Sequence, residues 1–166
     1  MLQALCVQGG LVTIHKFELF ADYFQLYLAD DGSEIDTSEI WNDESVRLKL
    51  AVAKNTLAVG TFRNVDVQLE IEILDHAPSI DISEWDHVSQ GYLTITNGKC
   101  VVYGCTDYLP DAHRVSLPSG DYSALSLAKG LSTITEEWED ADDYYKVVLW
   151  PSIEKEYKSL KCYENT

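Results

Sequence analysis

The sequence has little positive charge. Its 166 residues include 12 Lys and Arg against 28 Asp and Glu, which gives a formal net charge of −16. Nucleic acids and anionic membranes carry negative charge and would repel such a chain, so both are excluded as direct partners. The composition favours a basic protein or a cation as the partner, and it is equally typical of a well-solvated acidic surface.

Long apolar runs are also missing. No stretch approaches the ~20 apolar residues that a membrane-spanning helix requires. Residues 1–7 contain no basic residue and too short an apolar run for a signal peptide, so we expect a cytoplasmic protein. Its cysteines are then expected to be reduced and buried, and their spacing fits neither a redox pair nor a zinc knuckle. They are Cys6, Cys100, Cys105 and Cys162.

The motifs of common catalytic sites are absent. The sequence has no glycine-rich phosphate loop, no H-E-x-x-H pair and no G-x-S-x-G elbow. Cys105 with His87 or His113 is the nucleophile–base pair that the chain could still form, but sequence spacing gives it no support. We therefore expect a protein that acts by binding rather than an enzyme, and we assign no catalytic residue.

The sequence is rich in short β-prone stretches separated by turn residues. Residues 65–73 alternate apolar with polar side chains, which is typical of a strand with one buried face. Two β-prone stretches flank Asn97-Gly98, which predicts a hairpin, and residues 118–121 predict a second turn. About eight to ten strands of this kind predict an antiparallel β-sandwich, with a barrel as the alternative, in one domain over residues 1–166.

Two segments are less regular. Residues 44–53 alternate in polarity and predict a further strand, whereas residues 152–160 predict one or two helical turns at the C-terminus. Tyr23, Tyr27 and Tyr103 are expected on an outer face, where they would suit a homodimer surface.

Twenty of the 28 acidic residues fall into three blocks that contain no Lys or Arg. Residues 30–44 and 64–98 hold seven each, and residues 134–143 hold six. Carboxylates around a tryptophan favour binding to a basic protein such as a nuclease or toxin, because tryptophan is a preferred anchor and charge accelerates association. The alternative is that these are solvated loops whose tryptophans cap the core.

We assign the partner-binding site to the first and third blocks. Its predicted residues are Asp30, Asp31, Glu34, Asp36, Glu39, Trp41, Glu136, Glu137, Trp138, Glu139, Asp140, Asp142 and Asp143. DNA mimicry by the second block is less well supported. Its strand carboxylates at alternate positions are ~7 Å apart, whereas each DNA strand carries a charge every ~3.4 Å.

A calcium-binding or small-ligand-binding module is the alternative function. Asp107 with Asp111, and Asp140 with Asp142 and Asp143, would supply oxygen ligands if their loops meet at one end of the sandwich. Because no D-x-[DN]-x-[DN]-G loop is present, we assign no metal ligand and expect no cofactor. A structural accessory role is the third candidate.

The L-P-S-G-D-Y motif at residues 117–122 resembles a segment of the ComJ family, the inhibitors of the competence DNA-entry nuclease. The resemblance extends to the stretch at residues 15–20. Residues 104–112 and 147–151 are also similar to segments of uncharacterised bacterial all-β proteins. The resemblance implies a small bacterial all-β inhibitor or immunity protein that binds a nuclease. It carries over no specific inhibitory residue.

Overall fold

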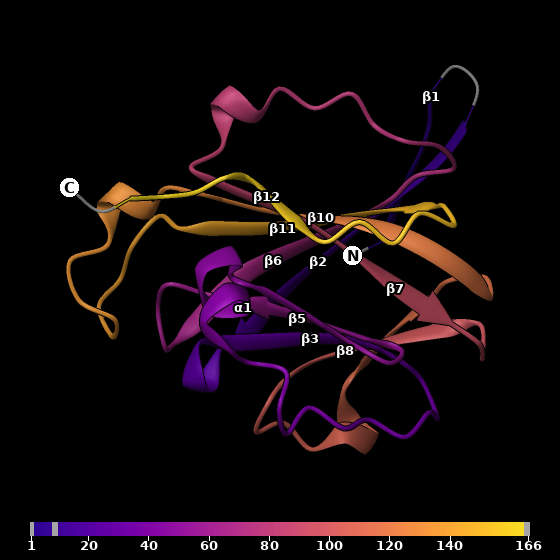
Figure 1. Cartoon of the computed structure of the whole chain (residues 1–166), viewed down its shortest axis with the longest axis horizontal. Helices are drawn as coiled ribbons and strands as arrows, with labels where there is room; N and C mark the ends of the chain where they lie inside the picture. The colour runs from indigo at the N-terminus through magenta and orange to yellow at the C-terminus, as the bar shows by residue number, and fades with distance from the viewer. Residues whose placement is uncertain (1, 8–9, 165–166) are drawn as a thin grey trace.

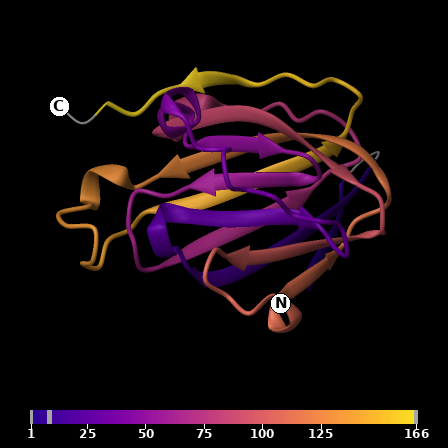
Figure 2. The same cartoon turned by 60° about the horizontal axis from the view of Figure 1, so that its bottom comes forward.

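The computed structural model describes the backbone of residues 2–7 and 10–164 and the side chains of residues 12–164. Its strands form two sheets that pack against each other around a shared hydrophobic core (Figures 1 and 2). The all-β sandwich predicted from the sequence is confirmed. Within the described ranges the strands number twelve, more than the eight to ten expected.

The larger sheet has seven strands and the smaller has five. In spatial order the larger sheet contains β1 (Leu2–Val7), β2 (Gly10–Phe20), β6 (Asp66–Ile73), β11 (Tyr144–Pro151), β10 (Gly120–Lys129), β7 (His87–Ile95) and β12 (Lys158–Lys161). The smaller contains β4 (Leu50–Ala53), β5 (Thr56–Gly60), β3 (Gln25–Asp30), β8 (Lys99–Gly104) and β9 (His113–Ser116). Every neighbouring pair is antiparallel except β6 and β11, which are parallel.

The apolar residues of β6 lie as predicted, whereas Glu70 on the opposite face, expected to face water, is buried. Val67, Leu69 and Ile71 are buried in the core between the sheets. On the opposite face, the Lys146 ammonium on β11 lies 2.9 Å from a carboxylate oxygen of Glu70 and 2.6 Å from one of Glu72. The neighbouring strand therefore supplies the positive charge that the second acidic block lacks in sequence.

The hairpin predicted at Asn97-Gly98 is wrong. β7 pairs with β10 and β12, whereas β8 pairs with β3 and β9, so this turn carries the chain from one sheet to the other. The buried Asp30 carboxylate accepts hydrogen bonds from the backbone N–H groups of Thr96 (2.9 Å) and Asn97 (3.1 Å). Gly98 has the positive φ of 73° that the dipeptide signals, but long-range contacts decide which strands pair.

The strand predicted over residues 44–53 is wrong in its first half, which forms helix α1 (Asp43–Leu48). A capping box starts the helix, because the Asn42 side chain accepts from the Ser45 N–H and the Ser45 hydroxyl accepts from the Asn42 N–H. Lys49 ends it in the left-handed conformation, and β4 follows. Val46, on the apolar side of that alternation, is 53% exposed.

The helical turns predicted at residues 152–160 are also wrong. Residues 152–157 form neither helix nor strand, and β12 adds to the edge of the larger sheet beside β7. The Tyr157 hydroxyl donates to the Leu50 carbonyl oxygen at 2.6 Å, which holds the segment against the smaller sheet. The structure instead places short 3-10 turns elsewhere, at η1 (Asp22–Phe24), η2 (Ile82–Glu84), η3 (Leu109–Asp111) and η4 (Leu131–Thr133).

The outer face of the smaller sheet is covered. Tyr27 and Tyr103 stack with ring centroids 5.3 Å apart, and side chains of the connection at residues 31–42, Trp41 among them, pack over them. The prediction that both tyrosines form an open dimer surface is therefore wrong, while Tyr23 is 67% exposed. Across the described ranges, no helix is long and apolar enough to span a membrane.

Candidate protein-binding site

The third acidic block forms a loop at one end of the sandwich, between η4 and β11 (Figures 1 and 2, left). Trp138, at the centre of the loop, has a 65% exposed side chain. Four carboxylates flank it in an exposed run: Glu136, Glu137, Glu139 and Asp140. The loop therefore presents an indole surrounded by negative charge.

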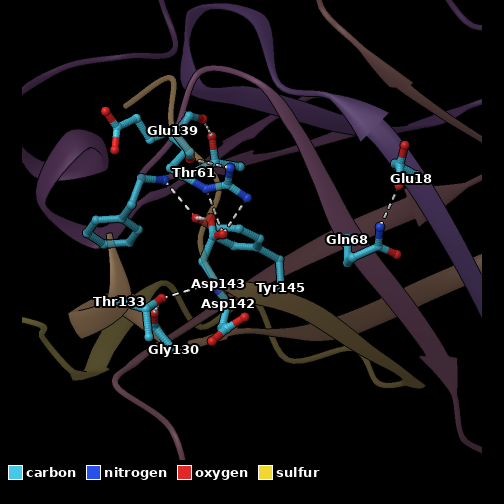
Figure 3. A network of polar contacts seen from close by, with 11 residues as sticks. Glu18, Thr61, Gln68, Gly130, Thr133, Glu139, Asp142, Asp143 and Tyr145 are labelled. Carbon is cyan, nitrogen blue, oxygen red and sulfur yellow. Dashed lines mark hydrogen bonds and ion pairs between the residues drawn. The ribbon is translucent and has the colours of Figure 1, made fainter. Parts of the chain in front are cut away.

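A buried ion pair fixes this loop. Arg63, between β5 and β6, donates from Nε to the Asp143 carboxylate at 2.7 Å, and its Nη2 lies 2.6 Å from the same oxygen. Its Nη1 donates to the Glu139 carbonyl oxygen at 2.9 Å. Figure 3 shows Asp143, Glu139 and Tyr145 gathered around these contacts. One guanidinium thus holds both the end and the middle of the acidic loop.

Tyr145 completes the buried cluster. Its hydroxyl donates to the second carboxylate oxygen of Asp143 at 2.7 Å and accepts from the Phe62 N–H at 2.9 Å. Burial, and then the nearby carboxylate, raise the pKa of Tyr145. The hydrogen bond to Asp143 raises the pKa of Arg63 despite its burial. The tyrosine therefore stays protonated as a donor, and the arginine stays charged.

Further hydrogen bonds tie the loop backbone to its neighbours. The Asn64 N–H donates to the Glu137 carbonyl oxygen at 2.9 Å. The Asp142 N–H donates to the Thr133 hydroxyl at 2.9 Å (Figure 3). Gly130 begins the turn with a φ of 73°, and a Cβ there would lie 2.2 Å from the Asp142 carbonyl oxygen. The exposed side chains therefore project from an ordered backbone.

The first acidic block divides between two ends of the sandwich. Asp30 and Gln25 are the two ends of β3, which places them about 17 Å apart at ~3.3 Å per residue. Asp31 stays with Asp30 and lies 3.4 Å from Arg114, whereas Trp41 is half-buried and donates from its indole N–H to Gln25 at 3.1 Å. The predicted binding residues that are exposed between them are Glu34, Asp36 and Glu39.

The prediction is wrong for two of the binding residues, Asp30 and Asp143, because both are buried. Asp30 is 0% exposed, and it accepts from the hydroxyls of Ser33 and Thr96 as well as from the backbone of the turn. Asp143 is buried against Arg63. Both carboxylates serve the fold and lie out of reach of a partner. The exposed part of the prediction in loop 134–143 is Glu136, Glu137, Trp138, Glu139, Asp140 and Asp142.

The residues that sequence reasoning missed are those that position the loop. Arg63 acts on Asp143 from 80 positions away, and no spacing rule links them. Phe62 and Tyr163 lie beside the loop and come from two other parts of the chain. An isolated Arg between two β-prone stretches was the one available signal for Arg63.

The structure gives little support to the two alternatives, a calcium site and a nucleophilic cysteine. Among the described residues, no three His, Cys, Asp or Glu side chains are grouped to hold a metal ion. The loops containing Asp107 and Asp143 lie apart in both views (Figures 1 and 2). Burial raises the pKa of the Cys105 thiol, which disfavours the reactive thiolate. Cys162, expected to be buried, is exposed.

Fold and loop together define a two-sheet β-sandwich with an anchored acidic loop. The structure is similar to the crystal structure of ComJ from Bacillus subtilis, an inhibitor of the DNA degrading activity of NucA. The TM-score is 0.66 at 14% identity, over 92% of this chain and 99% of that one. The product of crocagin biosynthetic gene J is similar at a TM-score of 0.56 and 16% identity, over 87% and 99%. No family model and no curated protein matches the sequence. The resemblance to ComJ indicated by the sequence is confirmed for the fold.

Proposed function

We propose that this protein inhibits a basic nuclease or toxin by binding it and covering its nucleic-acid site. The observation that supports the proposal most strongly is the exposed Glu-Glu-Trp-Glu-Asp run, residues 136–140, held by the buried Arg63–Asp143 pair. Proteins that cleave nucleic acids bind phosphates through Lys and Arg. An ordered acidic surface complements such a site. The ComJ fold, found in an inhibitor of a DNA-degrading protein, supports the same reading.

The anchored backbone matters for affinity. Binding through a mobile loop carries an additional cost of ~1–2 kcal/mol for each residue whose backbone has to be ordered. Here the backbone of the loop is already fixed at Glu137, Glu139 and Asp142. The carboxylates then increase the rate of association, and Trp138 supplies apolar contact at the centre.

The test starts with capture of partners from the native lysate on the immobilised protein, at low and at moderate salt. Captured basic proteins are purified and assayed for DNA degradation with and without the protein. We expect one of them to degrade DNA and to be suppressed at a near-equimolar ratio, with binding that weakens as salt increases. Captured proteins whose nucleic-acid cleavage is unaffected would contradict the proposal.

Charge variants locate the surface. The loop variant carries Glu136→Gln, Glu137→Gln, Glu139→Gln and Asp140→Asn. A matched control removes four exposed carboxylates outside the loop, through Asp75→Asn, Glu84→Gln, Glu154→Gln and Glu156→Gln. Both variants have the same net charge. Stronger loss of inhibition in the loop variant supports the site, and equal loss in both would contradict it.

A further inference from the structure

A groove of about 390 Å³ lies beside the acidic loop. Its apolar lining residues are Phe62, Leu131, Ile134, Trp138 and Tyr163, and its polar ones are Thr135, Glu136 and Glu137. Within the described part of the chain, no Lys or Arg lines it. Three aromatic rings and two exposed carboxylates therefore share one concave surface, assembled from three separate segments.

The aromatic wall is held firmly. Phe62 and Tyr163 meet edge to face, with centroids 5.8 Å apart, and the buried His87 ring packs edge-on against Phe62 at 5.8 Å. The Tyr163 N–H donates to His87 Nδ1 at 3.1 Å, which fixes the C-terminal segment in place. The Lys49 ammonium lies 4.5 Å from the centroid of Phe62 and donates to the Thr61 carbonyl oxygen. The Phe62 ring is therefore already occupied by the Lys49 ammonium, and Trp138, 65% exposed, is the aromatic side chain that is open to a ligand.

We propose that this groove binds an arginine side chain of the basic partner, an inference that rests on the proposed function and specifies its central contact. The guanidinium would lie against Trp138 and pair with Glu136 or Glu137. Charge complementarity argues for a cation, because the groove rim is acidic. The apolar lining argues for a side chain with a long aliphatic stem.

Arginine fits better than lysine for two reasons. Its planar guanidinium stacks on aromatic rings and forms paired hydrogen bonds with a carboxylate, whereas the lysine ammonium is a compact and strongly hydrated charge. The guanidinium also loses less hydration when it leaves water for an apolar groove. The groove should therefore discriminate between the two cations, and it should reject a neutral side chain of the arginine shape.

Indole N–H resonances provide a direct test that needs no partner. The probe is a blocked Gly-Arg-Gly peptide, with citrulline and lysine counterparts as neutral isostere and alternative cation. Trp138→Phe assigns the Trp138 resonance among the four tryptophans. We expect a saturable shift of Trp138 with arginine in the ~millimolar range, a weaker one with lysine and none with citrulline. Equal shifts with citrulline would overturn the inference.

Variants make the test specific. Glu136→Gln with Glu137→Gln should weaken arginine binding about tenfold, which corresponds to ~1.4 kcal/mol. The matched control neutralises two exposed carboxylates outside the groove, through Asp75→Asn and Glu84→Gln. It should leave arginine binding unchanged. Unchanged binding in the Glu136/Glu137 variant would overturn the inference.

Measurements with the partner distinguish failure of this inference from failure of the proposed function. If Trp138→Ala binds and inhibits the nuclease with full affinity, the groove is not the central contact, although the inhibitor proposal stands. If no nuclease is inhibited while Trp138 still responds selectively to arginine, the proposed function fails and the groove's selectivity stands.

Discussion

Arg63 and Asp143 lie 80 positions apart in the sequence and form a buried ion pair, with Nη2 and Oδ1 separated by 2.6 Å. The pair joins the connection after β5 to the end of the acidic loop. Arg63 also donates to the Glu139 carbonyl oxygen, so the stability of the protein and the shape of the loop depend on the same side chain.

Asp143→Ala should therefore lower the free energy of unfolding by about 3–5 kcal/mol, since it leaves a buried guanidinium without its counterion. Denaturant unfolding measures the change, and limited proteolysis should show new cleavage within residues 134–143. The exposed neighbour provides the control, because Asp142→Ala should change stability little. Equal effects of the two substitutions would rule out the anchoring role of the pair.

Asp30→Ala should destabilise the protein by roughly 3 kcal/mol, because it removes the acceptor for two backbone N–H groups at the turn between sheets. Thermal unfolding tests this. The exposed Asp36→Ala is its control. The folded fraction of the Asp30 variant should bind the partner as tightly as wild type does. A loss of binding that exceeds the loss of folded protein would show that Asp30 belongs to the interface.

Asp30 also predicts an effect of acid. Burial alone would raise the pKa of Asp30, but hydrogen bonds from Ser33, Thr96 and Asn97 outweigh it and lower the pKa below its ordinary value of 3.8. The stabilisation is therefore present above that value and is lost as the pH falls through the lower pKa of the folded state. Acid unfolding of wild type and Asp30→Asn should converge at low pH. A constant difference between the two would contradict this assignment.

His87 should make stability depend on pH closer to neutrality than Asp30 does. Burial lowers the pKa of His87 from 6.5, and the Leu48 carbonyl offsets this only in part. The folded protein then resists the proton that the unfolded chain accepts, so stability is complete above about pH 6.5 and falls below it. His87→Gln should reduce the decrease in melting temperature between about pH 8 and pH 5, and His15, whose pKa burial also lowers, should maintain a smaller decrease. His113→Gln, at an exposed site, should keep the wild-type slope.

The loop carboxylates should govern the rate of association with the partner. Neutralising the four exposed carboxylates at residues 136–140 should slow association about tenfold at low salt and flatten its dependence on ionic strength. Stopped-flow mixing measures both. The comparison variant changes Glu34, Asp36 and Glu39 in the first block. If that variant slows association more, the interface lies on the connection at residues 31–42 instead.

The predictable part of the fold is the part governed by local alternation. In β6, Val67, Leu69 and Ile71 point to the core as their spacing indicates, because each position depends only on its neighbours in the strand. The Asn97-Gly98 turn shows the limit of this reasoning. The hairpin signal predicts the turn correctly, but the turn connects the two sheets and is held by Asp30, 66 positions from Thr96.

Helix α1 was missed for a related reason. Val46, Leu48 and Leu50 alternate as in a strand, and the helix start depends on Asn42 and a Ser45 that replaces the usual Glu of a capping box. In the site, the exposed run at residues 136–140 could be predicted from composition. The burial of Asp143 could not, because its partner Arg63 is brought near only by the complete sandwich.

The parallel pairing of β6 with β11 has a consequence for synthesis of the chain. Gln68 pairs with Tyr144, so β6 lacks this neighbour until residues 144–151 have been made. The acidic loop ends where β11 begins, and Asp143 directly precedes the strand. A nascent chain therefore acquires Asp143, the anchor of its acidic loop, just before the strand that joins β6 to β10 in the larger sheet. Chains that stop before β11 would expose an open sheet edge and carry an unanchored loop.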